Sequence, residues 1–297
     1  MELRQLRYFL KATELLNFTE AAKQLYITQS TLSQQIKQLE TELNVLLFDR
    51  IGKKVYLTEA GTEFLPFAKQ TVFDADLGLQ RIRDIQGINI GTLRIGITYS
   101  LSFGLAPIIL KFMKEYPNIK LEVIYNTAME LLQMLKNRDL DFVLSFSMVV
   151  KEEQIEVTDL FDAPLCAIVH LRHPLAFQKN VSINDLKKYS LVLPSHGLSA
   201  RSALDELLRD QEEKLDPHLE MNDANILLQL VETSLYMTVL SKTTIVGRKE
   251  LKAIPILEQH NKMVASVLSL KDSYQKNSAK AFLDLYKKEL SVPNALR

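Results

Sequence analysis

The sequence has almost no cysteine, since Cys166 is the only one among 297 residues. An intramolecular disulfide is therefore impossible, which excludes a secreted scaffold held together by disulfide bridges. Cys166 and His170 lie four residues apart on an expected strand and share a face, but a metal site needs more ligands than these two. We interpret Cys166 as a buried structural residue and expect no metal site.

Long apolar runs and an excess of charge of either sign are also missing. No apolar stretch reaches the roughly 20 residues needed to cross a bilayer. The chain begins with an expected amphipathic helix rather than a signal peptide, so we expect a cytoplasmic protein with no membrane partner. The 36 basic and 36 acidic residues cancel. This balance argues against general coating of nucleic acid, which needs a strongly basic surface.

Catalytic motifs are missing as well. Gly197 and Ser199 begin like a nucleophile elbow, but Arg201 stands where the second glycine is needed. No glycine-rich phosphate loop follows the first strand of the expected α/β region. We therefore expect no catalytic residues and no cofactor.

Residues 18–37 carry the most informative pattern, two short amphipathic helices joined by a tight turn. The buried face of the second helix is marked by apolar residues at helical spacing: Leu32, Ile36, Leu39 and Leu43. Ala21 and Ala22 are small enough for the helices to cross closely, and Thr19 and Thr28 are candidate N-caps. Hydroxyl and amide side chains lie on the other face. A helix-turn-helix presents such a face to the major groove of DNA.

The following segment decides between DNA binding and the alternative, a surface helix pair with an ordinary polar face. Residues 46–50 and 55–57 are expected strands, joined by a basic turn as a hairpin wing. Lys53 and Lys54 at the tip of the wing would meet phosphate or the minor groove.

The first 61 residues closely resemble the N-terminal domain of bacterial LysR-type transcriptional regulators. The matching segments are Leu6-Arg7-Tyr8-Phe9, 17–22, 29–36, Leu39-Glu40, 47–50 and 57–61. The family often has proline at the position of Ser30 and arginine at that of Gln34, and both departures bear on which bases are read. The resemblance implies double-stranded promoter DNA as a partner. The candidate DNA contacts are Thr19, Thr28, Gln29, Ser30, Thr31, Ser33, Gln34, Lys37, Arg50, Lys53 and Lys54.

A long helix is expected after Thr58. Small and apolar residues recur there at spacings of four and three: Gly61, Leu65, Ala68, Val72, Ala75, Leu79 and Ile82. Such a heptad seam favours pairing with a second copy, and the alternative is packing on its own domain. Pro66 removes a backbone hydrogen bond, which predicts a kink near Thr62, and a hinge is expected at 87–91.

From Gly91 onward strands and helices alternate, which predicts an α/β region with a largely parallel sheet. The expected strands are 92–97, 120–125, 142–145, 165–170, 191–193, 218–221, 237–240 and 263–270. The expected helices are 103–116, 128–136, 199–214, 224–232 and 278–290.

This region resembles the effector domain of the same family more weakly, and Thr233-Ser234-Leu235 looks most like the cyanate-operon regulators. The resemblance implies two α/β lobes joined by crossing strands, as in periplasmic binding proteins. The expected fold is thus α+β and multidomain. It comprises a winged helix-turn-helix (1–57), a dimerising linker helix with a hinge (58–90) and an effector domain (91–297), whose lobe one is 91–161 plus 267–297 and whose lobe two is 162–266.

Small hydroxyl side chains follow the first α/β strand, where open sheets bind ligands and free helix amides favour an anion. Helix capping is the alternative. With the positions that the resemblance adds, the candidate effector contacts are Thr98, Ser100, Ser102, Thr127, Ser147, Ser195 and His196.

The sequence is identified as a LysR-type regulator that binds a promoter as a homodimer or homotetramer and responds to a small, anionic effector. One alternative is a cytoplasmic small-molecule-binding protein with an interaction module, against which the wing argues. The other is an enzyme with an added regulatory domain, against which the missing nucleophile, cofactor loop and metal ligands argue.

Overall fold

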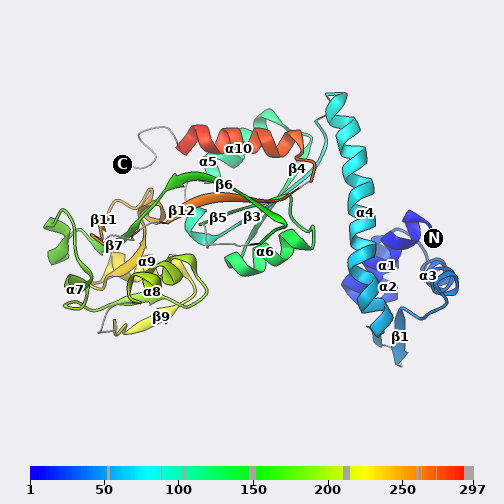
Figure 1. Cartoon of the computed structure of the whole chain (residues 1–297), viewed down its shortest axis with the longest axis horizontal. Coiled ribbons are helices and arrows are strands. Elements are labelled where there is room, and N and C mark those ends of the chain that lie inside the picture. The colour runs from blue at the N-terminus through cyan, green and yellow to red at the C-terminus, as the bar shows by residue number, and fades with distance from the viewer. Residues whose placement is uncertain are drawn as a thin grey trace. The chain divides into compact units, whose positions relative to one another are not determined.

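The computed structural model describes residues 1–51, 54–87, 89–102, 105–146, 152–209, 215–258, 261, 263–271 and 273–290. The chain divides into two compact units, Met1–Gly87 and Ile88–Arg297 (Figure 1). Each unit is described by itself.

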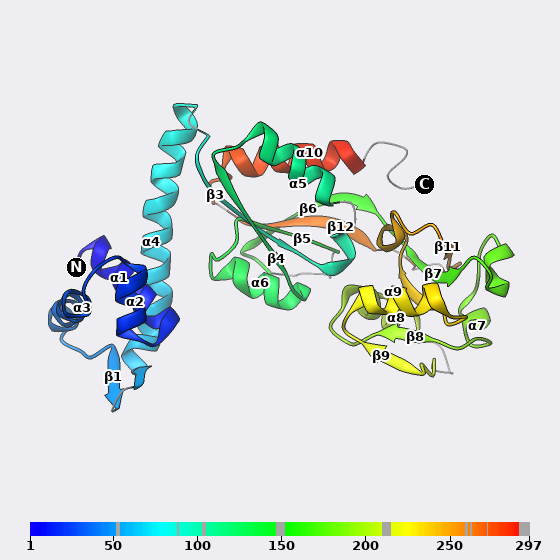
Figure 2. The ribbon, with the colours of Figure 1, turned by 180° about the vertical axis from the view of Figure 1, so that it is seen from behind.

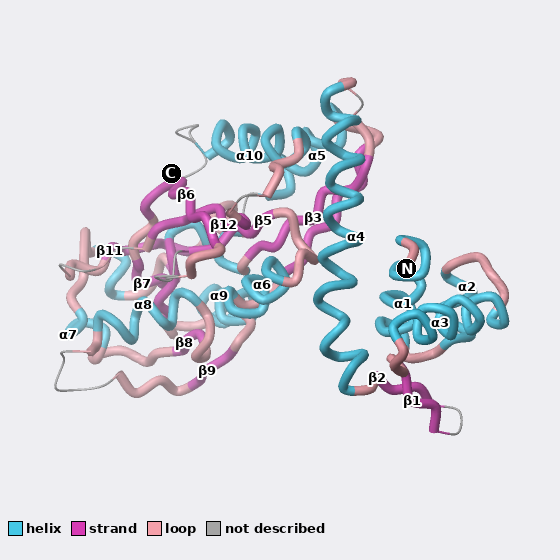
Figure 3. The backbone as a smooth tube through the Cα atoms, turned by 45° about the vertical axis from the view of Figure 1, so that its right-hand side comes forward, coloured by secondary structure: helices cyan, strands magenta, loops and turns pink. Residues whose placement is uncertain are grey.

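Within its described residues, the first unit has three short helices, a hairpin and one long helix (Figure 3). These are α1 (Leu3–Leu15), α2 (Phe18–Gln24), α3 (Gln29–Leu43), β1 (Phe48–Ile51), β2 (Lys54–Leu57) and α4 (Glu59–Ile85). The buried face expected for α3 is confirmed, because Leu32, Ile36 and Leu39 are fully buried. They share a core with Phe9 and Phe48, whose ring centroids lie 5.4 Å apart.

Side-chain caps decide where α2 and α3 begin. Thr28 is the N-cap of α3, as expected, and its Oγ1 accepts the N–H of Thr31 at 3.1 Å. The cap expected at Thr19 is wrong. Asn17 caps α2 instead, since its Oδ1 accepts the N–H groups of Thr19 and Glu20 at 3.0 and 3.1 Å. The helix therefore starts earlier than the threonine suggested.

The long helix α4 continues through Pro66, and its two halves have different surroundings. In the first half, Ala68 is buried and Val72 packs against the core of its own unit. In the second half, Leu79 and Ile82 are 51% and 53% exposed. The predicted heptad seam is thus corrected. The first half of the seam packs on its own domain, and the apolar side chains of the second half are exposed.

Five described strands form the sheet of lobe one, in the order β4-β3-β5-β12-β6. They are β3 (Gly91–Ile97), β4 (Ile119–Tyr125), β5 (Phe142–Phe146), β6 (Ile155–Asp162) and β12 (Val264–Leu270). β3 is parallel to β4 and β5, whereas β12 is antiparallel to both of its neighbours. Helices α5 (Leu105–Glu115) and α10 (Asn277–Leu290) cover one face and α6 (Ala128–Lys136) covers the other (Figure 2).

Lobe two contains an antiparallel sheet of order β10-β7-β11 and a parallel pair, β8-β9, connected to β10 by a bridge between Leu191 and Met237. Its elements are β7 (Leu165–His170), α7 (Ile183–Leu186), β8 (Val192–Pro194), α8 (Ser199–Leu207), β9 (Leu219–Met221), α9 (Ala224–Thr233), β10 (Thr238–Ser241) and β11 (Leu251–Pro255). The chain enters lobe two after β6 and returns to lobe one through β12. At this passage the N–H of Ala163 donates to the oxygen of Met263 at 2.8 Å.

Several expectations for this unit are corrected. The unit does not have a largely parallel sheet, because β12 runs antiparallel to both of its neighbours in the five-stranded sheet and the β10-β7-β11 sheet is antiparallel throughout. β6 and β11 were missed, since most side chains of the edge strand β6 are exposed and its apolar period is weak. α8 ends at Leu207, and the rest of the helix expected to reach 214 lies partly outside the described residues. In the described part of the chain, no helix combines the length and apolar character that crossing a bilayer requires.

Candidate nucleic-acid interface and effector cleft

The outward face of α3 presents the expected row of polar side chains. Gln29, Ser30, Gln34 and Lys37 are exposed, and Ser33 is half-buried. The Nε2 of Gln29 donates to Ser33 Oγ at 3.1 Å, which orients the amide along the helix. An amide nitrogen carries two hydrogens, so one N–H and the carbonyl oxygen stay available for a base edge.

Hydroxyl groups gather at the first turn of α3. Thr28 Oγ1 lies 2.8 Å from both Ser30 Oγ and Thr31 Oγ1, and all three residues are exposed. Thr19 is exposed on the first turn of α2. The helix-turn-helix thus brings these four candidates to the ends of two adjoining helices.

A buried carboxylate connects α3 to the hairpin that follows it. Glu40 is 8% exposed, and its Oε1 accepts the N–H groups of Leu47 at 2.9 Å and Phe48 at 3.2 Å. This contact sets the start of β1 against the end of α3. The sequence shows Glu40 only as part of the family motif. No local pattern indicates that its carboxylate accepts hydrogen bonds from the start of a strand eight residues later.

The expected wing is present as an antiparallel hairpin, in which Phe48 pairs with Leu57 and Ile51 with Lys54. Lys53 lies outside the described residues, as do the side chains of Arg50 and Lys54. Their roles as phosphate contacts therefore stay predictions.

The loop after β3 holds three candidate effector hydroxyls in three different environments. Thr98 is 5% exposed, and none of the described residues hydrogen bonds to its Oγ1. Ser102 Oγ donates to the oxygen of Tyr99 at 2.7 Å and is used locally. Ser100 is buried, and its backbone carbonyl oxygen, not its hydroxyl, accepts a hydrogen bond from Thr243 Oγ1 of lobe two at 3.1 Å.

The alternative of helix capping applies to Thr127. Its hydroxyl lies 2.6 Å from Glu130 Oε2 and accepts the N–H of Glu130 at 3.3 Å, in a capping box at the start of α6. Ser147 lies outside the described residues.

In lobe two, Ser195 and His196 follow β8. The Ser195 N–H donates to the oxygen of Met221 at 2.9 Å. The His196 ring lies between two side chains of α8, with Nδ1 3.0 Å from Asp205 Oδ2 and Nε2 3.0 Å from Arg201 Nη2. It lines a depression of about 380 Å³ beside α8. His196 is thus engaged by its own lobe.

Tyr99 lies among the candidate effector hydroxyls but was not itself one of the candidates. It belongs to a 3₁₀ turn, Tyr99–Leu101, between β3 and α5. Burial raises the pKa of its hydroxyl, and the nearby carboxylate of Asp223 raises it further, whereas Arg248 lowers it. Asp223 is the N-cap of α9, and Arg248 binds Glu232 at 2.8 Å, so both belong to lobe two. The two lobes therefore meet here through groups of both charges, which no sequence pattern placed together.

Cys166 is buried, and the His170 ring bonds to the backbone of its own loop. Burial raises the pKa of the Cys166 thiol to about 11, so the thiol is protonated at neutral pH. Nδ1 of His170 accepts the N–H of Arg172 at 3.0 Å. Cys166 is buried, as expected.

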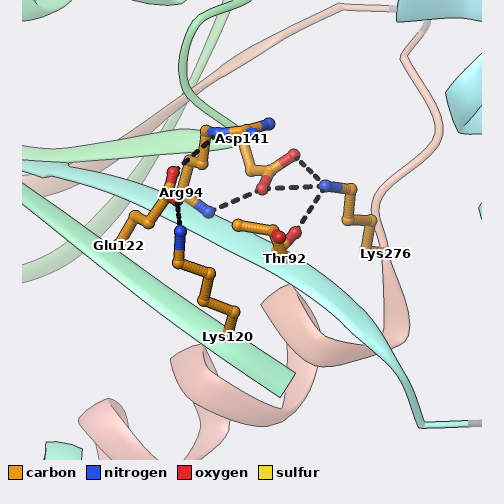
Figure 4. A network of polar contacts seen from close by, with 6 residues as sticks. All are labelled: Thr92, Arg94, Lys120, Glu122, Asp141 and Lys276. Atoms are coloured by element: carbon orange, nitrogen blue, oxygen red, sulfur yellow. Dashed lines mark hydrogen bonds and ion pairs between the residues drawn. The ribbon is translucent and has the colours of Figure 1, made fainter. Parts of the chain in front are cut away.

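Lobe one has a polar network where the chain enters it, shown in Figure 4. Lys276 Nζ lies 2.8 Å from Asp141 Oδ1 and 2.9 Å from the oxygen of Thr92. Asp141 Oδ2 accepts the N–H of Arg94 at 2.8 Å, and Arg94 Nε donates to Glu122 Oε2 at the same distance. The network joins β3, β4, the start of β5 and the segment before α10.

Two family models match the chain. The one described as "Bacterial regulatory helix-turn-helix protein, lysR family" matches residues 3–62. The one described as "LysR substrate binding domain" matches residues 86–291. Together they match residues 3–62 of the first unit and most of the second, and leave most of α4 unmatched.

Curated relatives and solved structures agree with these matches. The transcriptional dual regulator GltC of Bacillus subtilis is 32% identical over 245 residues, 82% of this chain and 82% of GltC. The HTH-type transcriptional activator CmpR of Synechocystis sp. is 29% identical over 225 residues, 76% of this chain and 74% of CmpR. CbnR complexed with its target DNA has a TM-score of 0.67 at 22% identity, covering 97% of this chain and 100% of CbnR. A full-length OxyR variant from Pseudomonas aeruginosa has a TM-score of 0.73 at 21% identity, covering 100% and 97%. These two structures show a shared fold.

Proposed function

The chain belongs to the LysR family of bacterial transcriptional regulators, and we propose from this premise which of its residues read DNA, pair two copies and receive the effector. It is a DNA-binding regulator with an effector-binding domain and not an enzyme. The observation that carries the proposal is the exposed row of amides and hydroxyls on α3 beside a hairpin wing.

In the proposed complex, α3 enters the major groove of promoter DNA. Gln29, Ser33 and Gln34 face base edges, and the hydroxyls at the first turn face phosphates. Lys53 and Lys54 of the wing contact phosphate or the minor groove. The fold shared with CbnR, which was solved on its target DNA, supports this placement.

Two copies pair through the open second half of α4. Leu79, Ile82 and Ile85 are 51%, 53% and 75% exposed, and a Cβ at Gly78 would meet nothing within 4 Å. A helix exposing this much apolar surface gains by burying it against a second copy. Pairing presents two reading helices to one approximately palindromic site, as a homodimer or as half of a homotetramer.

The effector binds between the lobes, beside the loop after β3. This site is supported by the buried Thr98 hydroxyl, which has no hydrogen-bond partner among the described residues, and by the influence of Asp223 and Arg248 of lobe two on the pKa of Tyr99. We propose that the effector is a small anion, because Arg248 and the neighbouring hydroxyls can bind negative charge. The carboxylate of Asp223 repels an anion and so opposes this binding. The proposed location is the cytoplasm, where promoter DNA and small metabolites are both accessible.

Binding to DNA from upstream of the chain's own gene tests the reading helix. In fluorescence anisotropy, Gln29→Ala should cost about 1–3 kcal/mol of specific binding and relax preference at one base pair. A scrambled duplex should bind both proteins equally. Gln178→Ala, an exposed glutamine of the second unit, is the matched control. Unchanged preference in a binding-site selection would remove Gln29 from the reading set.

A further inference from the structure

Tyr26 occupies a backbone position that tyrosine rarely takes. It lies in the turn between α2 and α3 with φ +55°. The turn ends α2 with two hydrogen bonds, from the N–H of Ile27 to the oxygen of Ala22 at 3.0 Å and from the N–H of Tyr26 to the oxygen of Lys23 at 3.1 Å. This pair defines a Schellman motif, whose left-handed residue is usually glycine because a Cβ is strained there.

Packing within the chain does not compensate for this strain. The Tyr26 side chain is 96% exposed, so its ring is almost entirely in solvent. The other left-handed residues of this unit differ. Asn44 is a type that tolerates this conformation, and Leu16 is only 45% exposed. Glycine at this position would stabilise the fold better than tyrosine, because the exposed ring gains almost no packing and the tyrosine Cβ strains the turn.

The position of the turn indicates what the side chain contacts. Tyr26 precedes Thr28, the N-cap of α3, by two residues. It therefore adjoins the hydroxyls of Thr28, Ser30 and Thr31, which gather at the first turn of the proposed reading helix. A side chain beside a helix that enters the groove meets the sugar-phosphate backbone at the edge of that groove.

We propose that the Tyr26 hydroxyl donates a hydrogen bond to a DNA phosphate at the edge of the groove entered by α3. The proposal rests on the proposed role of α3 as the reading helix. Tyr26 is thereby a positioning residue, which sets the register of α3 and reads no base. Because a tyrosine hydroxyl is neutral, the contact adds affinity without releasing counterions, unlike a contact made by lysine.

The test combines a hydroxyl deletion with a salt series. Tyr26→Phe should weaken binding about tenfold on both specific and scrambled duplexes, since it removes one hydrogen bond to a charged group. The slope of log affinity against log salt should stay that of the wild type. Lys53→Ala should instead lower that slope.

A second variant separates DNA contact from folding. Tyr26→Gly removes the side chain and the backbone strain together, so it should raise the thermal midpoint while weakening DNA binding at least as much as Tyr26→Phe. Asn44→Gly is the matched control, because it changes a left-handed residue at the far end of α3 and should leave DNA binding unchanged.

Three results would overturn the proposal. These are wild-type binding by both Tyr26 variants, a loss that depends on one base pair, and a Tyr26→Gly variant whose thermal midpoint falls together with its DNA binding. A wild-type protein that does not distinguish promoter from scrambled duplex would instead refute the proposed reading role of α3, which keeps the two failures distinguishable.

Discussion

Hydroxyl side chains at the ends of strands have two uses in lobe one. The hydroxyls of Thr127 and Ser102 make local hydrogen bonds that stabilise the start of a helix and the end of a turn. Thr98 differs, because its buried Oγ1 has no partner among the described residues. An unsatisfied buried hydroxyl is unfavourable until a ligand or water bonds to it. Among the candidates, Thr98 is therefore the residue whose hydroxyl would gain most from a hydrogen bond to an effector.

Thr98→Val keeps the shape of the side chain and removes this hydroxyl. The ligand-free protein should become more stable by about 1 kcal/mol, because no unsatisfied group remains. The response of a promoter reporter to inducing growth conditions should weaken, with basal DNA binding retained. Urea unfolding and an anisotropy titration measure the two effects. A less stable variant would show that the hydroxyl already has a partner.

At the scale of elements, α4 has two different environments along one continuous helix. Its first half completes the core of the DNA-binding unit through Ala68 and Val72. Its second half leaves Leu79 and Ile82 exposed. A heptad repeat alone does not distinguish these two settings, because the same spacing suits a domain core and a second helix.

Ile82→Glu should therefore separate the copies without unfolding the domain. A charge in the paired seam would be unpaired and buried, at a cost of about 3 kcal/mol or more. We expect monomers in light scattering and an unchanged circular dichroism spectrum. Val72→Glu is the contrasting variant, which should lower the thermal midpoint because Val72 packs in the core. A dimeric Ile82→Glu protein would place the pairing surface elsewhere.

At the scale of the whole effector-binding unit, the two lobes are joined by more than their connecting strands. Thr243 Oγ1 donates to the backbone oxygen of Ser100 across the lobes, and Asp223 of lobe two raises the pKa of the Tyr99 hydroxyl. A ligand shifts such a structure only if it prefers one lobe arrangement over another. The contact between Ser100 and Thr243 already joins the lobes and sets the starting point of that equilibrium.

Thr243→Val should loosen this connection, since it leaves the Ser100 oxygen without its donor. Hydrogen–deuterium exchange should accelerate in the turn at 99–101 as well as around Thr243. Thr244→Val is the matched control, because the Thr244 hydroxyl donates to Ser241 within lobe two at 2.7 Å. That variant should change exchange in lobe two alone. Equal effects in both lobes from both variants would argue against a specific role for the Thr243 bond.

Much of the molecule is determined by local sequence. Apolar periodicity predicts the buried stripe of α3, which is formed by Leu32, Ile36 and Leu39. The reach of a threonine side chain predicts the cap at Thr28, and turn composition predicts the hairpin that follows α3. Each of these properties depends on residues within a few positions of one another. The helix-turn-helix and its wing were therefore predictable, and they also carry most of the family resemblance.

Tertiary structure alone decided which residues separated along the chain come together. Ser100 meets Thr243, 143 residues later, and Ala163 meets Met263. Such contacts depend on how strands and lobes pack, and no local period encodes them. The same reason explains why the heptad spacing of α4 could not show that its first half packs on its own unit. Thr127 differs, because its capping box with Glu130 is a local contact that a Thr-x-x-Glu pattern indicates.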